Sequence, residues 1–487
     1  MTLMTTPMLI LTIVLCVIAA FIAVLLIRTA LFKPEAEEAR RRKVLRMAEA
    51  DKNVAIDRLS KLVRCKTVSH KRDDDTDWKQ FERFIYLLDK LYPLVTQFCP
   101  RSFAGKTGMV YTWAGSTNKK PIVLMAHYDV VPPGDGWSGD PFSGEIKDGS
   151  IWGRGTLDTK GTLAAILEAA ELLIRSGFSP ERTVYFAFSG EEETGGPSCP
   201  DIVEWFEKKH VRPAAVFDEG GAVISGVFPG VEREAAMIGV AEKGQADLEI
   251  VSNRRGGHAS SPAAQTSVTE LAAAIEKISK HPLKGEFIEP VRGLFERLGP
   301  YASFKYRFIY ANLWLFGPWL VRTSAKTGGQ FSAMFRTTTA VTMLKGSDAA
   351  NVLPSTAKAW ADMRILPGQT VEEACDELAR RIGDENITIE ILTDRPPTSV
   401  APAEGHEWDT LVSVIRDTWI EAIPCPYMMT ARTDSRNYEK ICDRIYRFSP
   451  YSLTHEDMAL MHGPDEHLAI DSYYTAIAFY FRLMREI

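Results

Sequence analysis

The chain has 487 residues, of which 45% are hydrophobic and 25% are charged, and its formal net charge at pH 7 is −6. This is the composition of a globular protein, and the length predicts two domains rather than one core. The acidic balance argues against a nucleic-acid-binding surface, and seven scattered cysteines without a Cys-x-x-Cys pair argue against a disulfide framework or a cysteine-built zinc site.

The most apolar segment of the chain lies near its N-terminus. Residues 8–27 carry no charge, and Thr12 is their only polar side chain. At a rise of about 1.5 Å per residue, a helix of this length crosses the roughly 30 Å hydrocarbon core of a bilayer, so we predict a transmembrane anchor. A cleaved signal peptide is the alternative, although no cation precedes the segment and its length exceeds the usual apolar region of about 7–15 residues. A lipoprotein cleavage site is disfavoured because Cys16 follows Leu15 rather than a small residue.

The cations nearest this segment all follow it. They are Arg28, Lys33 and the run from Arg40 to Lys43. By the positive-inside rule, this distribution favours a cytoplasmic location for the main body of the protein. Two glutamates stand four residues ahead of two of these arginines, which predicts a charged helix over residues 34–64. Its first part, within 28–53, would lie beside the membrane.

Residues 54–242 alternate predicted strands with predicted helices. The strands are expected at 108–115, 121–130, 183–190 and 214–221, and the helices at 78–88 and 162–175. Such alternation predicts an α/β domain with a mostly parallel sheet covered by helices on both faces. Residues 397–487 are predicted to complete this catalytic domain.

The pattern changes between residues 243 and 396. Strand, helix, strand, strand, helix and strand are expected at 245–253, 266–279, 338–346, 355–365, 370–383 and 387–392. This order is the split ferredoxin-like arrangement, and we predict that it forms a lid inserted into the catalytic domain. Residues 304–321 are dense in aromatic side chains. We interpret them as buried lid core, with a lipid-facing or acyl-chain-binding surface as the alternative.

Five segments carry side chains that can bind a metal ion. They supply His127, Asp158, the pair Glu192 and Glu193, Asp218, and His462. Taken singly, these residues have ordinary explanations, such as a core histidine, a helix cap, an acidic patch or a turn. Together, two imidazoles and several carboxylates suit zinc or a similar divalent ion. Two ions about 3.5–4 Å apart can share one bridging carboxylate.

Two further roles follow from such a centre. His127 comes directly after a predicted strand, at the end where open α/β sheets place their ligands. Asp129 would then accept the other N–H of His127 and fix its tautomer. One glutamate must stay free of metal, because hydrolysis needs a base that takes a proton from water.

The segments MAHYDVVP, GRGTLDTKG, SGEEETGG, FDEGG, GGHASSP, NVLPSTAKAWADMRILPG and MHGPDEHLAI occur in this order. They resemble the successive motifs of the co-catalytic zinc peptidase family of carboxypeptidase S, glutamate carboxypeptidase, aminoacylase and acetylornithine deacetylase. The resemblance runs from about residue 55 to the C-terminus. NLWLFGPWL and RTTTAVTMLKG resemble the branch of carboxypeptidase S and the N-fatty-acyl-amino-acid hydrolase/synthase in particular.

The resemblance implies a role for each motif residue. Two Zn²⁺ ions, or similar ions such as Co²⁺ or Mn²⁺, would share Asp158. One site would be completed by His127 and Asp218, and the other by Glu193 and His462. Glu192 would be the general base.

The lid motifs imply substrate contacts. His258 would donate to the developing oxyanion, often from a partner subunit in dimeric relatives, which suggests a homodimer through the lid. Arg364 and Asn351 would hold a free carboxylate of the substrate. The chain departs from the family pattern at Glu191, where an aspartate is usual, and at Ala431-Arg432, where relatives commonly carry glycine. The second departure leaves the shape of the neighbouring pocket open.

The expected function is therefore metal-dependent hydrolysis of an N-acyl amino acid, with an N-fatty-acyl substrate favoured weakly by the aromatic segment. A carboxypeptidase or dipeptidase acting on short peptides with a free C-terminal carboxylate is the alternative. An inactive scaffold would have lost a ligand or the base, and all of them are present. A transport or signalling role finds no support, because the apolar segment contains no charge.

Overall fold

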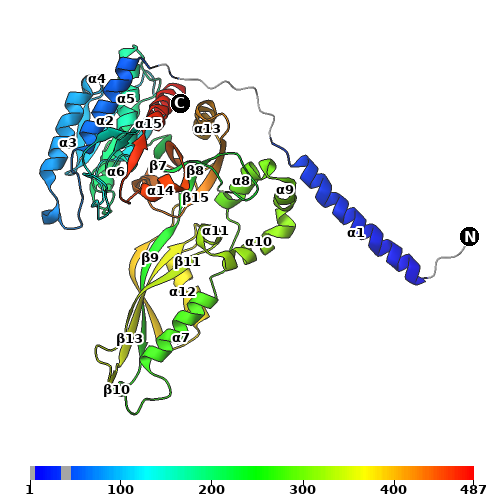
Figure 1. Ribbon diagram of the computed structural model, residues 1–487. Helices are drawn as coiled ribbons and strands as arrows, with labels where there is room; N and C mark the ends of the chain where they lie inside the picture. Colours follow the sequence, from blue (N-terminus) through cyan, green and yellow to red (C-terminus); the bar gives the residue numbers. More distant parts are fainter. Residues whose placement is uncertain (1–5, 35–44, 46, 227) are drawn as a thin grey trace, which may run out of the picture. The chain divides into compact units, whose positions relative to one another are not determined.

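The computed structural model describes residues 6–34, 45, 47–226 and 228–487 (Figure 1). The chain divides into two compact units. The eight-stranded unit comprises residues 40–225, 234–243 and 397–487, and the four-stranded unit comprises residues 1–39, 226–233 and 244–396.

The eight-stranded unit is built on one mixed sheet with the strand order β1-β2-β6-β3-β7-β16-β8-β15. Its central strands pair in parallel, β3 with β6 and β7, and β16 with β7. The sheet thus confirms the predicted α/β class with a mostly parallel sheet. The strands are β1 (Arg101–Ala104), β2 (Gly108–Trp113), β3 (Ile122–His127), β6 (Val184–Ser189), β7 (Ala215–Ile224), β8 (Ala235–Glu242), β15 (Ile423–Met429) and β16 (Ile445–Leu453).

Strand β3 is buried on both faces, which explains its unbroken apolar sequence. Ile122, Leu124 and Ala126 belong to one hydrophobic core, whereas Val123 and Met125 belong to the other. Helices α2 (Glu49–Val63), α3 (Trp78–Leu91), α5 (Lys160–Arg175), α13 (His406–Thr418) and α15 (Ile470–Glu486) contribute to the first core, and α6 (Ser198–Lys208) to the second. The strand is therefore held rigidly up to the residue at which it ends, His127.

Several short elements complete this unit. A small sheet has the order β17-β5-β4, and the unit also contains two short helices. These elements are β4 (Glu145–Lys147), β5 (Ser150–Trp152), β17 (His467–Ala469), α4 (Pro93–Phe98) and α14 (His455–Leu460). The pairing of β17 with β5 brings the C-terminal segment beside the loop that leads to Asp158.

The four-stranded unit contains an antiparallel sheet of order β11-β13-β9-β14. Helices α7 (Ser267–Lys280) and α12 (Val371–Ile382) pack on it through a core to which alternate residues of β13 contribute, among them Ala359 and Met363. The strands are β9 (Gly244–Asn253), β11 (Thr338–Lys345), β13 (Thr356–Ile365) and β14 (Ile387–Arg395). A separate ladder joins β10 (Gly257–His258) to β12 (Val352–Leu353). The connectivity is the βαββαβ order expected from the sequence.

The aromatic segment 304–321 is not the buried core that we expected. It forms α9 (Phe304–Tyr310) and the first part of α10 (Leu313–Thr327), between α8 (Glu289–Leu298) and the short helix α11 (Gly329–Ala333). Phe304, Trp314 and Trp319 have exposed fractions of 61%, 54% and 52%. Only part of the segment, including Tyr310 and Leu320, is buried.

The N-terminal segment forms one helix, α1 (Thr6–Leu31), and Pro7–Leu31 is long and apolar enough to cross a membrane. The same length and composition would also suit a signal sequence. Part of the charged helix predicted over residues 34–64, namely residues 35–44 and 46, lies outside the described residues. The next helix, α2, begins at Glu49.

Candidate metal centre

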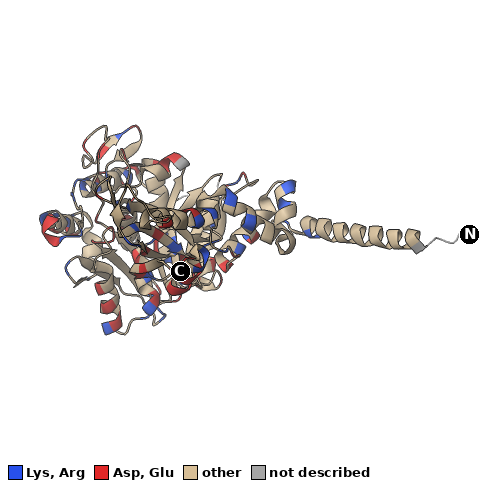
Figure 2. Ribbon diagram, turned by 90° about the horizontal axis from the view of Figure 1, so that it is seen from below, with Lys and Arg blue, Asp and Glu red and all other residues tan. Residues whose placement is uncertain are grey.

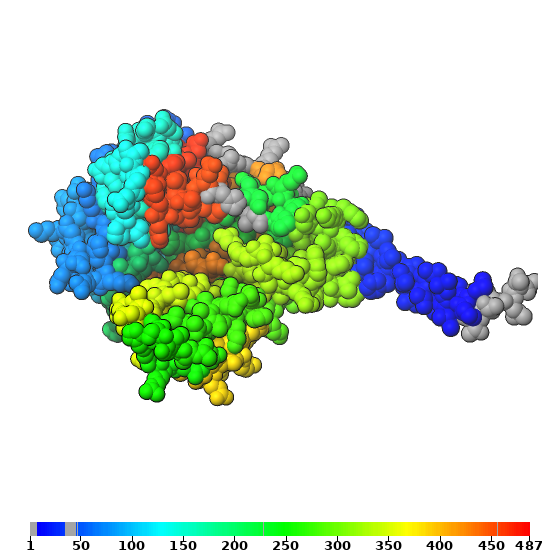
Figure 3. Space-filling model, turned by 60° about the horizontal axis from the view of Figure 1, so that its bottom comes forward, coloured from blue at the N-terminus to red at the C-terminus, as the bar shows by residue number. Residues whose placement is uncertain are grey.

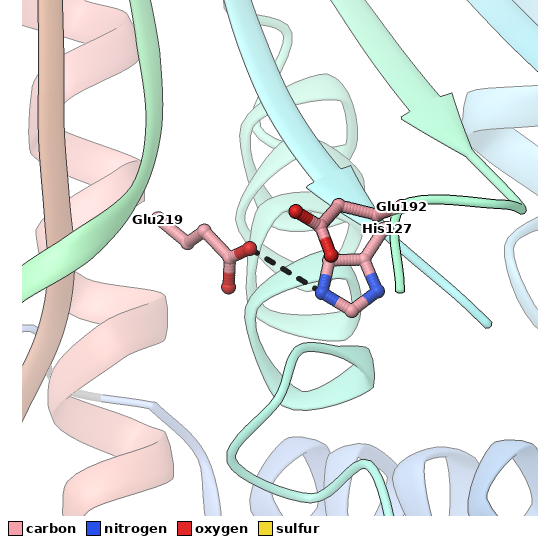
Figure 4. A group of neighbouring side chains, drawn as sticks. All are labelled: His127, Glu192 and Glu219. Atoms are coloured by element: carbon pink, nitrogen blue, oxygen red, sulfur yellow. Dashed lines mark ion pairs between the residues drawn. The ribbon is translucent and has the colours of Figure 1, made fainter. Parts of the chain in front are cut away.

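The candidate ligands gather where the central parallel strands end. His127 is the last residue of β3 and pairs with Ser189, the last residue of β6. Glu192 and Glu193 follow β6 within four residues, and Glu219 lies on β7, the other neighbour of β3. Figure 4 shows Glu219 and Glu192 beside the imidazole of His127. Parallel pairing therefore brings three segments, far apart in sequence, to one edge of the sheet.

Asp158 stands between two imidazoles. Its Oδ1 lies 2.9 Å from Nε2 of His127, and its Oδ2 lies 3.0 Å from Nε2 of His462. Glu193 contacts His462 at 3.2 Å, and Glu219 contacts Nε2 of His127 at 3.3 Å. Each oxygen of Asp158 thus faces a different histidine, as expected for a carboxylate that bridges two ions.

Two overlapping groups could each hold an ion. One consists of His127, Glu192 and Glu219, and the other of His127, Asp158 and Glu193. Within each group the candidate ligand atoms lie within 4.8 Å of one another. Imidazole nitrogens with carboxylate oxygens form a donor set that suits Zn²⁺ and similar divalent ions. Because both groups use His127, a second ion would need His462, which faces Asp158 and Glu193; with it, the side chains present fit a two-ion centre.

Asp218, which the motifs predict to be a ligand, does not belong to either of these groups. Its Oδ2 accepts a hydrogen bond of 3.1 Å from the backbone N–H of Ser435. Successive side chains of a strand point to opposite faces, so only one of the two neighbouring carboxylates can face His127. In the structure that carboxylate belongs to Glu219.

We expect the two neighbouring carboxylates to respond differently to neutralisation. Glu219→Gln should lower metal affinity by more than about 100-fold, since a direct ligand matters at least as much as the groups that support ligands. Asp218→Asn should retain both ions, because its side-chain oxygen can still accept from Ser435. Metal content after dialysis, measured by mass spectrometry, checks this. If the Asp218 variant alone loses metal, Asp218 and not Glu219 is the ligand.

Asp129 organises the glutamates that follow β6. It is fully buried, and its two carboxylate oxygens accept hydrogen bonds of 3.1 Å from the backbone N–H groups of Glu192 and Glu193. Nδ1 of His127 lies 3.0 Å from the main-chain oxygen of Asp129 and 3.4 Å from its carboxylate. A carbonyl oxygen only accepts, so Nδ1 donates to it, and Nε2 is the nitrogen that faces Asp158 and Glu219 and could bind an ion. Asp129 therefore lies beside the ring as the prediction requires, but the hydrogen bond to His127 is made by its main-chain oxygen and not by the predicted carboxylate.

Glu466, which was not predicted to have a role, supports the loop that carries Asp158. Its fully buried carboxylate pairs with Arg154 at 2.6 Å. The other oxygen accepts from the backbone N–H groups of Gly155 at 3.1 Å and Leu157 at 2.8 Å. Glu466 stands four residues after His462, so one short segment supplies a candidate ligand and fixes the loop of another.

Burial and crowding of charge shift the pKa values in the cluster. Burial and nearby carboxylates such as Asp434 raise the pKa of Glu192 well above its ordinary value, although His127 opposes this. Burial raises the pKa of Glu219 to about 8. Hydrogen bonds to Asp158 and Glu193 raise the pKa of His462 to about 10. Without an ion, Glu219 and His462 therefore hold protons near neutral pH, and cation binding would release these protons.

The three residues predicted to contact substrate lie in the four-stranded unit. His258 is exposed on β10, where its Nδ1 lies 2.7 Å from Oγ of Ser260. Asn351 is adjacent, because its main-chain oxygen accepts from the N–H of Ala259 at 3.0 Å. Arg364 is near the far end of β13, where its Nε donates to Asp362 at 2.7 Å. From Thr356 to Arg364 the strand extends about 26 Å, so Arg364 lies far from the other two within this unit.

Residues 123–486 match the family described as Peptidase family M20/M25/M40. The chain belongs to this family. It is 35% identical to the probable carboxypeptidase S-like 2 of Dictyostelium discoideum, over 88% of this chain and 84% of that protein. It is 34% identical to the N-fatty-acyl-amino acid synthase/hydrolase PM20D1 of Xenopus tropicalis, over 96% of this chain and 93% of that protein.

A solved structure agrees with the fold. The M20 family metallo-carboxypeptidase Sso-CP2 from Sulfolobus solfataricus superimposes with a TM-score of 0.64 at 18% identity, covering 90% of this chain and 99% of that chain. The family and the branch predicted from the motifs are therefore confirmed. The chain is a metallohydrolase of the M20 family that acts on amide bonds.

Proposed function

We propose that this M20 enzyme uses two divalent ions to hydrolyse the amide bond of N-acyl amino acids, and of N-fatty-acyl amino acids in particular. The position of Asp158 carries the proposal. Its two oxygens face His127 and His462 at 2.9 and 3.0 Å, and a carboxylate so placed can serve two ions at once. His127 and Glu219 would hold one ion, and Glu193 and His462 the other, with Zn²⁺, Co²⁺ or Mn²⁺ all suited to these donors.

Glu192 is the side chain best placed to move protons. When bound, the ions would polarise the substrate carbonyl and lower the pKa of water at the site. Glu192 would take a proton from that water and deliver it to the leaving nitrogen. Its raised pKa favours this exchange, because a group with an ordinary carboxyl pKa holds a proton only briefly at neutral pH. Asp129 keeps Glu192 in place through the hydrogen bond to its backbone N–H.

Contacts to the rest of the substrate are assigned to the four-stranded unit. His258 would donate to the oxyanion, a stabilisation that often supplies a large part of catalysis. Asn351 and Arg364 would bind the free carboxylate of the amino acid, and because they lie far apart within one unit they would come from two copies of the chain. Arg364 already directs Nε and Nη2 toward Asp362, at 2.7 and 3.2 Å, which leaves Nη1 for the substrate. The distance between Arg364 and His258 along one unit agrees with the use of two copies of the chain in a homodimer.

Two observations bear on the class of substrate: the similarity of the chain to two kinds of enzyme, and the presence of the apolar helix α1. Similarity to the N-fatty-acyl-amino acid synthase/hydrolase covers nearly the whole chain and favours a long acyl group. Similarity to the carboxypeptidase S-like protein favours the alternative, a carboxypeptidase or dipeptidase. We further propose that α1 anchors the enzyme in a membrane, where an acyl chain would be concentrated close to the enzyme.

Hydrolysis of a matched substrate panel tests the proposal. The full chain in nanodiscs with Zn²⁺ would be given N-oleoyl, N-acetyl and dipeptide substrates that share one C-terminal amino acid. We expect kcat/KM for the oleoyl substrate to exceed that for the dipeptide by at least about tenfold, since each buried methylene adds favourable binding. A preference for the dipeptide would establish the carboxypeptidase alternative. Full activity of the Glu192→Gln variant would show that the turnover comes from another enzyme.

A further inference from the structure

Helix α1 is joined to the rest of its unit by a buried polar contact. Asn312, between α9 and α10, is fully buried, and its amide donates to the main-chain oxygen of Leu25 at 3.2 Å and to Oγ1 of Thr29 at 3.3 Å. The guanidinium of Arg28 donates to the main-chain oxygen of Ala311 at 3.3 Å. Polar contacts between helices are a common way to join helices in an apolar surrounding. The last two turns of α1 are therefore part of the folded four-stranded unit.

A second contact places α10 beside the apolar part of α1. The rings of Trp314 and Phe21 pack edge to face with centroids 6.0 Å apart. Phe21 precedes Arg28 by seven residues, or about 10 Å along a helix. Figure 2 shows that α1 carries no charge until the cation in its last turn. Figure 3 shows that α1 adjoins the surface formed by residues near 310. A membrane that surrounds α1 up to Arg28 would therefore also reach Trp314.

The outward face of α10 changes in character along the helix. Trp314, Leu315 and Trp319 are exposed to 54%, 37% and 52%, and they lie on the same side of the helix as the exposed Arg322 and Lys326. The apolar half begins beside α1, and the cations follow about 12–18 Å further along. Residues 304–327 contain four cations and no acidic residue. Tryptophan followed by lysine and arginine is the pattern of a helix at a membrane surface.

A cavity beside the contact between α1 and α10 is lined by both apolar and cationic side chains. It encloses about 640 Å³ between the end of α1, α8 and α10. Apolar side chains such as Phe287 and Trp314 line it together with Arg28 and Arg292, and the acidic side chains Glu286 and Glu296 also border it. A hollow with guanidinium groups among aromatic rings suits an amphiphile, whose anionic head and acyl chain need both kinds of contact.

From these contacts we infer that α9 and α10 form a membrane-contacting face: the side chains of Trp314, Leu315 and Trp319 enter the lipid beside α1, and Arg322 and Lys326 meet anionic headgroups. The occupant of this exposed face is the bilayer itself. The inference rests on the proposed anchoring of the enzyme through α1. It goes beyond anchoring, because the bilayer would hold the four-stranded unit through α10 as well as through α1.

Fluorescent labels on the full chain test this face. In vesicles of phosphatidylcholine and phosphatidylserine, the polarity-sensitive dye NBD would be attached to Leu315→Cys in a Cys16→Ser background, in which the remaining native cysteines are buried. Leu392→Cys, 52% exposed on β14, is the matched control in the same unit. Acyl chains carrying a nitroxide should quench the label at 315 at least about twofold more than that at 392, because an interfacial side chain lies within reach of the acyl chains. Equal quenching at the two positions would overturn the inference.

Two further measurements separate the sources of failure. A label on native Cys16, exposed on α1, reports whether α1 itself lies in the bilayer. If Cys16 is quenched by lipid and position 315 is not, the membrane-contacting face is refuted while the anchor stands. If neither is quenched, both fail. Protection of position 315 from lipid nitroxides and from aqueous iodide alike would show that protein, such as a second copy of the chain, covers this face. Amide hydrolysis by the same samples reports on the proposed function independently.

Discussion

Glu192→Gln is expected to lower kcat for amide hydrolysis by about 10²–10⁴-fold, the usual contribution of a general base. The amide cannot accept the proton of water, yet it has nearly the same shape as the carboxyl group. The hydrogen bond from the backbone N–H of Glu192 to Asp129 would remain. Metal content should therefore be unchanged, and steady-state kinetics together with metal analysis would check both statements.

The neighbouring Glu191 provides a matched control. Its Oε2 accepts a hydrogen bond of 2.7 Å from Oγ1 of Thr107, which holds the side chain away from the ligand groups. Glu191→Gln should retain most of the activity. A Glu192 variant that loses metal along with activity would contradict the assignment as base. It would make Glu192 a ligand instead, a role open to it because it lies in one of the two candidate groups.

Asp158→Asn is expected to remove both ions rather than one. Each oxygen of Asp158 faces a different imidazole, and an asparagine offers a single oxygen without charge. Affinity for both ions should fall by more than about 100-fold, and activity should fall with it. Zinc that binds the native enzyme would stabilise it by mass action, so we expect Zn²⁺ to raise the Tm of the native chain but not that of the variant.

Thermal unfolding with and without Zn²⁺, combined with metal analysis, measures this effect. Asp135→Asn is a suitable control, because Asp135 is exposed in the loop after β3 and belongs to neither ligand group. It should keep the full response to zinc. Retention of one ion per chain by the Asp158 variant would show that the two sites fill independently and that Asp158 does not bridge them.

Much of the sheet and most of the site could be predicted because strand ends are visible in the sequence. An apolar run that stops at His127 or shortly before Glu192 marks the edge of a parallel sheet. The choice between Asp218 and Glu219 could not be made, since it depends on the phase of alternation in β7, and both residues are acidic. Both residues lie at the right place in the sequence and both have a suitable carboxylate. Only the structure shows which of the two side chains faces His127.

Other features depend on contacts between distant segments. The exposure of Trp314 depends on how α9 and α10 pack with α1, which local periodicity does not report. The adjacency of His258 and Asn351 depends on the short ladder between β10 and β12. Glu466 lay inside a recognised motif, yet its role appears only when its partners in the loop before Asp158 are seen. Such partners are hundreds of residues away in the chain.

The pairing of Arg154 with Glu466 also has a consequence for biosynthesis. The two residues are 312 positions apart in the chain, and His462 is made just before Glu466. While the ribosome is still translating the preceding residues, the loop of Asp158 lacks its carboxylate support and one candidate ligand. Domains of a growing chain fold in the order of synthesis, but this centre is completed only when the segment from His462 to Glu466 has emerged. Metal loading would therefore follow the synthesis of this segment, and a chain that stops before residue 462 would lack the parts that complete the proposed two-ion centre.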